Sequence, residues 1–209
     1  ELAAGTDLRW LGFSYIAFRL LSVLIDAGKG RKLVLSAGDF ITYVCFPPAL
    51  AAGPIDRADH FSKELNRETE TFSSDLSVAA GRIGTGLFKK FILSDSLSLI
   101  ALSGNNFASF QSSGWAWAAL IAYSFQLYFD FSGYSDIAIG LAKILGISLP
   151  ENFNHPYRKP DIAKFWSSWH ITLTQWIRSY VFNPLTRKLR LKKDPAVPQW
   201  LIILVTQFV

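Results

Sequence analysis

A histidine set among tryptophans in an apolar part of the chain is the strongest candidate for chemistry. His170 lies in the sequence FWSSWHITLTQW (165–176), with Trp166, Trp169 and Trp176 as aromatic neighbours. An imidazole, whose ordinary pKa is near neutrality, can take a proton from a hydroxyl group or polarise an acyl carbonyl. Burial among aromatic rings favours the neutral ring, which is the form that a general base needs. The same position is also compatible with a structural role for a buried, hydrogen-bonded side chain.

Three charged residues within or beside apolar segments are further candidates for a functional role. Asp130 and Asp136 flank the sequence FSGYS (131–135), which we expect to break a helix. They can cap the helix ends at this break or act as an acid and a base. Arg178 can pair with either aspartate or bind an anionic group, because charge retained at membrane depth is expensive and is usually paired or functional.

The sequence argues against several other kinds of site. The histidines, His60, His155 and His170, lack the paired spacing of metal ligands on a helix, and the single cysteine, Cys45, excludes a disulfide framework and a cysteine zinc cage. We therefore expect no metal site. No GxSxG motif is present, which argues against a serine hydrolase. The glycines of GRIGTG (81–86) have the wrong spacing for a phosphate loop and suit close helix packing instead.

The distribution of charge indicates a membrane protein. Half of the 209 residues are hydrophobic, and no charged residue occurs from Ser96 to Phe129. A bilayer span needs about 20 mostly apolar residues, whereas a soluble helix of that length normally shows a charged face. We expect several membrane helices, with Trp115–Phe129 as the clearest span. A large soluble core is the alternative.

Polar and basic segments separate the apolar ones. Residues 54–77 are predicted to form an extramembrane segment that contains a short amphipathic helix. The net charge is +5, and positive residues gather in TRKLRLKKD (186–194). Beside apolar spans, the positive-inside rule makes this a cytoplasmic loop rather than a nucleic-acid patch, so we expect no nucleic acid partner.

Prolines, glycine and aspartate mark the expected helix ends. Pro47 and Pro48 should stop a helix, and Gly146 should end another. Asp161 is expected to cap a helix that runs through His170 and is closed by Pro184.

Four sequence blocks resemble the membrane-bound O-acyltransferase family. These are FPPALAAGPIDR (46–57), GLFKKFILSDSL (86–97), YFDFSGYSDIAIGLAKILGISLPENFNHPY (128–157) and FWSSWHITLTQWIRSYVFNPL (165–185). They cover nearly the whole chain in the order found in the family. The nearest branch is the bacterial one that includes alginate O-acetyltransferase and the D-alanyl transferase of teichoic acids.

The resemblance implies an all-α fold in which multi-pass transmembrane and re-entrant helices surround a central funnel. Residues 1–209 would form a single membrane-embedded acyltransferase domain in the cell (inner) membrane. The implied reaction moves an acyl group, with acetyl favoured over D-alanyl, to hydroxyls of an extracytoplasmic polysaccharide. No cofactor is expected to be bound, because the donor, an acyl thioester such as acetyl-CoA or an acyl carrier on the cytoplasmic side, is a co-substrate. The expected partners are the lipid bilayer, this donor, and the polysaccharide or a periplasmic acyltransferase.

The resemblance also implies roles for residues. His170 falls on a histidine of the family and is the expected catalytic residue, and Thr172 and Thr174 keep the hydroxyls of the family's serines. The tryptophans would wall the site and exclude water, and the two asparagines would hold a re-entrant turn. The expected substrate-binding residues are Trp166, Trp169, Thr174, Trp176, Arg178, Asn152 and Asn154.

Both ends of the sequence suggest part of a longer chain. There is no methionine, and the apolar run at 200–209 is too short to span a bilayer. The family's second catalytic histidine is expected beyond Val209, so the 209 residues alone should be inactive. Two alternatives remain: a subunit that relays the acyl group to a separate periplasmic transferase, and a solute transporter.

Overall fold

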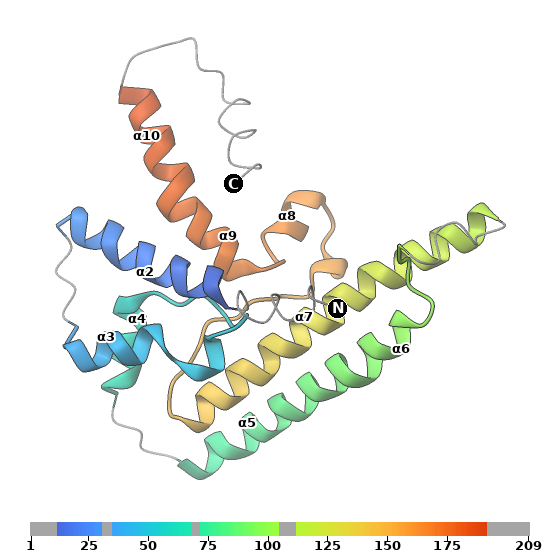
Figure 1. The fold of residues 1–209 in the computed structure, drawn as a ribbon, viewed down its shortest axis with the longest axis horizontal. Coiled ribbons are helices and arrows are strands. Elements are labelled where there is room, and N and C mark those ends of the chain that lie inside the picture. Colours follow the sequence, from blue (N-terminus) through green and yellow to red (C-terminus); the bar gives the residue numbers. More distant parts are fainter. Residues whose placement is uncertain (1–11, 31–34, 68–71, 105–111, 192–209) are drawn as a thin grey trace, which may run out of the picture. The chain divides into compact units, whose positions relative to one another are not determined.

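The computed structural model describes residues 12–30, 35–67, 72–104 and 112–191. All regular elements in these ranges are helices, which confirms the predicted all-α class (Figure 1). The chain forms two compact units. The first contains Glu1–Cys45, Pro54–Ser62 and Pro150–Val209, and the second contains Phe46–Gly53 and Lys63–Leu149.

The first unit holds short helices from both ends of the chain. Its elements are α2 (Phe13–Gly28), α3 (Ala37–Val44), the start of α4 (Ala58–Leu65), the 3-10 turn η4 (Pro156–Arg158), α8 (Ile162–Trp166), α9 (Ile171–Ile177), the π-helix η5 (Arg178–Phe182) and α10 (Asn183–Leu191).

Two long-range contacts anchor α2 in this unit. Trp176 packs edge-on against Phe18, with ring centroids 4.7 Å apart, and its Nε1 donates to the Phe18 carbonyl at 3.1 Å. Arg19 is buried, and its Nη1 donates to the carbonyls of Tyr43 (3.0 Å) and Val44 (2.9 Å). These carbonyls belong to the last turn of α3, where no partner exists within the helix, so the guanidinium satisfies them and is itself satisfied.

The second unit is built on two long helical segments. Its elements are the 3-10 turn η1 (Pro47–Ala49), α5 (Phe72–Leu87), the π-helix η2 (Phe88–Ser94), α6 (Asp95–Ser98) and α7 (Ser113–Ile144). The segment from α5 to α6 runs along α7 (Figure 1).

Glycines let these two segments approach closely. A Cβ atom built on Gly133 would lie 2.7 Å from the Gly86 carbonyl oxygen, and one built on Gly86 would lie 2.6 Å from the Gly133 oxygen. This confirms the packing role predicted for the GRIGTG glycines at Gly86, whereas Gly81 and Gly84 have open space around them. The helix break predicted at FSGYS (131–135) is wrong: α7 runs through it, because Gly133 serves the helix contact and does not end the helix.

The aspartates on either side of FSGYS form ion pairs across the same contact. Asp136 accepts from Arg82 Nε at 2.7 Å and from Lys89 Nζ at 2.6 Å, and Asp130 pairs with Lys90. The two carboxylates therefore pair with cations of α5 and η2. This is a structural role, but it is not the predicted capping of helix ends, because α7 continues through both residues.

No helix in the described part of the chain combines the length and the apolar character needed to cross a membrane. Trp115–Phe129, the predicted span, lies within α7 and does not meet this criterion, because polar residues such as Gln126 interrupt its aliphatic residues.

Several predicted helix boundaries are confirmed. The 3-10 turn at Pro47 and Pro48 follows the end of α3, and Gly146, at φ 78°, follows the end of α7. The short helix expected in the polar segment 54–77 is α4. Asp161 caps α8 by accepting from the Lys164 amide at 2.7 Å.

The helix expected from Asp161 to Pro184 is interrupted. It divides into α8 and α9 around residues 167–170, and Pro184 does not end it, because a proline is tolerated in the first turn of α10. The basic segment 186–194 is helical up to Leu191. Its last three residues and the apolar run at 200–209 lie outside the described residues.

Candidate functional site

His170 lies in the interruption between two helices. With 5 and 7 residues, α8 and α9 are too short to cross a bilayer, which takes about 20 residues. The backbone of His170 has φ 44° and ψ 55°, in the left-handed region that non-glycine residues seldom adopt. This conformation costs on the order of 1–2 kcal/mol, and such strain is concentrated at functional sites.

Backbone hydrogen bonds from a distant segment hold this turn. The Asn152 carbonyl accepts from the Ile171 amide at 2.9 Å, and the Asn154 amide donates to the Ser168 carbonyl at 3.0 Å. The segment 152–154 thus runs beside the turn and is bonded to both of its ends. The structure brings both asparagines expected near a re-entrant turn to that turn.

A chain of hydrogen bonds fixes the imidazole of His170. Its Nδ1 lies 2.9 Å from Asn152 Oδ1, which also accepts from the Thr172 hydroxyl at 2.9 Å. The Thr172 hydroxyl in turn accepts from the Ile55 amide at 3.1 Å, so its one hydrogen is directed to Asn152. Because an amide oxygen only accepts, Nδ1 must carry the ring hydrogen, and Nε2 carries the lone pair.

The surroundings of His170 keep the ring neutral. Burial lowers its pKa to about 4, because a charged imidazolium is disfavoured away from water. Asn152, its hydrogen-bond partner, is 0% exposed. The ring of Tyr15 stacks on the imidazole, with centroids 6.4 Å apart and an interplanar angle of 20°. At neutral pH the ring is therefore uncharged, and its Nε2 lone pair can accept a proton.

The three predicted tryptophans have different surroundings. Trp176 is buried in the core of the first unit. Trp169 belongs to an aromatic cluster, in which it meets Phe153 edge-on at 5.2 Å and stacks on Phe165 at 5.7 Å. Trp166 is 56% exposed, so the structure does not place it on a wall of the site.

The threonine that joins the site is Thr172. Thr174, included in the expected binding set, is exposed and donates to the Trp169 carbonyl at 3.4 Å. Thr172 is 3% exposed and bonds to Asn152. The difference arises because the left-handed turn at His170 changes which side chains share a face with the imidazole.

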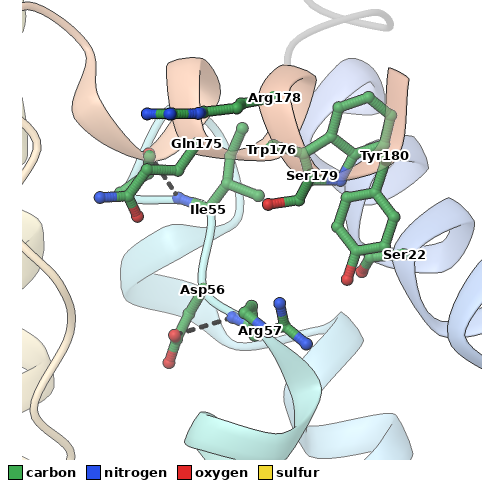
Figure 2. A pocket seen from close by; sticks show the side chains of 10 residues that line it. Ser22, Ile55, Asp56, Arg57, Gln175, Trp176, Arg178, Ser179 and Tyr180 are labelled. Carbon is green, nitrogen blue, oxygen red and sulfur yellow. Dashed lines mark hydrogen bonds between the residues drawn. The ribbon is translucent and has the colours of Figure 1, made fainter. Parts of the chain in front are cut away.

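A cavity of ≈ 200 Å³ is lined by residues that include Ile55 and Arg178 (Figure 2). Thr172 belongs both to the cavity wall and to the hydrogen-bond chain of His170, since its hydroxyl bonds to Asn152 and its side chain lines the cavity. Polar and aromatic side chains make up much of the wall. The lining includes Ile55, Arg57, Gln175, Trp176 and Arg178.

Sequence reasoning about single residues missed Tyr15, Ile55 and Arg57. Tyr15 lies in an apolar run with no local signal of function. Ile55 and Arg57 lie in the block FPPALAAGPIDR (46–57) that resembles the family, and this was the available signal. Ile55 contributes through its backbone amide, which no side-chain pattern predicts.

A neutral histidine with a fixed tautomer is suited to general base catalysis, and comparison with known proteins gives the family. The family model described as MBOAT, membrane-bound O-acyltransferase family, matches residues 5–197. The chain belongs to this family of membrane-bound proteins.

Curated relatives agree with this membership. The chain is 40% identical to a probable alginate O-acetylase of Azotobacter vinelandii over 84% of its own length and 35% of the relative. It is 39% identical to a peptidoglycan O-acetyltransferase of Helicobacter pylori over 70% of its length and 28% of the relative. It is 31% identical to a teichoic acid D-alanyltransferase of Streptococcus thermophilus over 85% of its length and 44% of the relative. The chain thus spans between a quarter and a half of the length of these relatives.

Proposed function

We propose that the protein transfers an acyl group to hydroxyl groups of an extracytoplasmic polysaccharide, with His170 as the general base. The observation that carries this proposal is the 2.9 Å contact of His170 Nδ1 with Asn152 Oδ1, which leaves the lone pair on Nε2. The names of the relatives support acyl transfer to cell-surface polymers.

The proposed chemistry is a direct transfer. Nε2 of His170 takes the proton of the acceptor hydroxyl as its oxygen attacks the acyl carbonyl of a thioester donor. The carbon–sulfur bond then breaks, and the thiol leaves with a proton returned by the imidazolium. An ester and a free thiol are the products. A general base in this position contributes roughly 10²–10⁴-fold to the rate.

Acetyl is the proposed acyl group, because two of the three relatives described above are named for O-acetyl transfer. The donor is proposed to be acetyl-CoA or an acyl carrier, which acts as a co-substrate, and no bound cofactor or metal takes part. The acceptor is a polysaccharide or a periplasmic partner that passes the group on.

We also propose that the chain is embedded in the inner membrane as part of a multi-pass helical protein with a central funnel. Many large apolar side chains in the described ranges are exposed, among them Leu24 (67%), Leu99 (83%), Trp115 (69%) and Ile162 (70%). Apolar surface on this scale usually contacts lipid or a partner.

The test uses a labelled acyl thioester and membranes that contain the full-length protein, because residues 1–209 alone are expected to be inactive. We expect labelled polysaccharide to form, with release of free thiol. Label that stops on a periplasmic protein would favour the relay alternative. Passage of an unmodified substrate across the membrane with no acyl transfer would overturn the proposal in favour of a transporter.

A further inference from the structure

The cavity beside Thr172 contains an arginine whose charge is not neutralised by an ion pair. Arg178 is the first residue of the π-helix η5, and its side chain lines the cavity while remaining exposed to solvent (Figure 2). Within the described part of the chain, no carboxylate forms an ion pair with it. Single-turn π segments occur frequently at functional sites.

The second arginine of the cavity is already engaged. Arg57 Nε donates to Asp59 Oδ1 at 3.0 Å, and its Nη2 lies 3.5 Å from Asp26 Oδ2. Two carboxylates therefore offset the charge of Arg57. Among the described residues that line the cavity, Arg178 remains available to an incoming anion.

Asp56 is the one carboxylate among the described residues that line the cavity, and it also has partners. Asp56 Oδ1 accepts from the Arg57 amide at 2.8 Å, and its Oδ2 lies 2.8 Å from His60 Nδ1. The side chain of Gln175, three residues before Arg178 on the same helical face, adds an amide donor to the wall. The cavity thus presents donors and positive charge from α9 and η5.

The size of the cavity limits what it can hold. Its volume of ≈ 200 Å³ is below the roughly 300–1,000 Å³ of pockets that enclose whole small-molecule ligands. It suits a single polar group rather than a sugar ring or a nucleotide. A guanidinium is a planar fork that binds phosphate through two parallel hydrogen bonds.

We propose that Arg178, assisted by Gln175, binds the phosphate ester of the acyl thioester donor. The inference rests on the proposed function. A phosphate ester at the end of the pantetheine arm is shared by coenzyme A and by phosphopantetheinyl carriers, so the chemistry is the same for both sources.

The spacing along the helix agrees with this assignment. Arg178 stands eight residues after His170, which is about 12 Å of helix at ~1.5 Å per residue. The pantetheine arm places its thioester sulfur roughly 15 Å from its phosphate when extended, at ~3.3–3.6 Å for each three backbone bonds. A phosphate held by Arg178 can therefore place the thioester near the imidazole.

The test compares donors with and without the phosphate in membranes that contain the protein. The donors are acetyl-phosphopantetheine, acetyl-pantetheine and acetyl-CoA, together with an acetylated carrier protein.

For Arg178→Gln we expect the KM of acetyl-phosphopantetheine to rise about tenfold or more, as when a charge-assisted bidentate contact is lost, and kcat to change little. Arg178→Lys should recover part of the loss. Arg187→Gln, at an exposed arginine of α10, is the matched control and should leave KM unchanged.

The effect of Arg178→Gln on the KM of each donor shows whether Arg178 binds the phosphate. The KM of acetyl-pantetheine should not respond to Arg178→Gln, and whichever of acetyl-CoA and the carrier shows the increase is the natural source of the phosphate. An equal increase with and without the phosphate would overturn the inference, as would a change confined to the KM of the acceptor.

A binding measurement separates this inference from the proposed function. S-ethyl-phosphopantetheine, which cannot transfer an acyl group, should bind the purified protein and lose about tenfold in affinity with Arg178→Gln. If the protein transfers no acyl group but shows this loss, the proposed function fails and the phosphate site stands. If the protein transfers acyl groups and the variant binds the analogue as well as the wild type does, the phosphate site is wrong.

Discussion

At the scale of single residues, the orientation of one amide determines which nitrogen of His170 accepts a proton. Asn152 receives hydrogen bonds from His170 and from Thr172 at its Oδ1, both at 2.9 Å. Because Thr172 is itself fixed by the Ile55 amide, the arrangement depends on a contact between distant parts of the sequence. We therefore propose that Asn152 is a positioning residue that acts through the histidine.

Replacing Asn152 tests this role. Asn152→Ala should lower kcat by about tenfold or more, because the ring loses the acceptor that fixes its tautomer. Asn152→Asp restores an acceptor but adds a negative charge, which raises the pKa of His170. We therefore expect this variant to regain part of the rate and to shift the acid limb of the pH profile upward. Asn154→Ala, at an exposed side chain of the same segment, is the control. An unshifted acid limb in Asn152→Asp would contradict a positioning role.

The pH dependence of the reaction follows from burial of the imidazole. The pKa of His170 is lowered to about 4, so the ring is neutral above that pH and becomes charged as the pH falls through it. A general base is lost on protonation, so kcat/KM should stay high down to about pH 5 and fall below it, whereas an unperturbed histidine would give a limb near 6.5. A limb between pH 6 and 7 that is assigned to His170 by substitution would show that the ring is not desolvated during catalysis.

At the scale of elements, local sequence predicted most helix ends but misjudged two interruptions. Asp161 and Gly146 cap or end helices as expected, because their signals are local. The segment FSGYS (131–135) was expected to break a helix, yet α7 continues through it, and Gly133 contacts Gly86, which is distant in the sequence. The true interruption, at His170, is held by segment 152–154, so local propensity could not reveal it.

The glycine contact gives a prediction about stability. Gly133→Ala should destabilise the fold by about 1–3 kcal/mol, because the new methyl group would press on the Gly86 carbonyl and the Lys90 amide. Gly84→Ala, in α5 with open space around it, should be neutral or stabilise by up to about 1 kcal/mol, because alanine favours helix. Thermal unfolding of the purified protein in detergent measures both. Equal effects of the two substitutions would show that the helices do not meet at Gly133.

In the candidate site, too, some residues could be predicted from the sequence, whereas others depend on contacts between distant segments. His170 and Asn152 were accessible from the resemblance of two sequence blocks to the family. The choice of Thr172 over Thr174 was not, because it depends on the left-handed turn at His170. The contact of the Ile55 amide with Thr172 could not be predicted either, because it depends on how the segments of the first unit pack.

At the scale of the whole molecule, family membership and exposed apolar surface support residence in a membrane. The chain matches the membrane-bound O-acyltransferase family over residues 5–197. We expect the protein to sediment with the inner membrane, to resist extraction by alkaline carbonate, and to be released by detergent. Apolar side chains such as Leu99 and Trp115, 83% and 69% exposed, would then contact lipid. Recovery of the protein in the carbonate supernatant would contradict an embedded domain.

Acyl transfer by a variant of His170 tests the central claim most directly. Asparagine adopts the left-handed conformation readily but cannot serve as a base near neutral pH, so His170→Asn removes the base with little effect on the backbone. His155, exposed and with the same φ of 44°, provides the matched control His155→Asn. With labelled thioester and polysaccharide, we expect His170→Asn to lose roughly 10²–10⁴-fold in rate and His155→Asn to remain close to the wild type. Transfer by His170→Asn at the wild-type rate would contradict the assignment of the base.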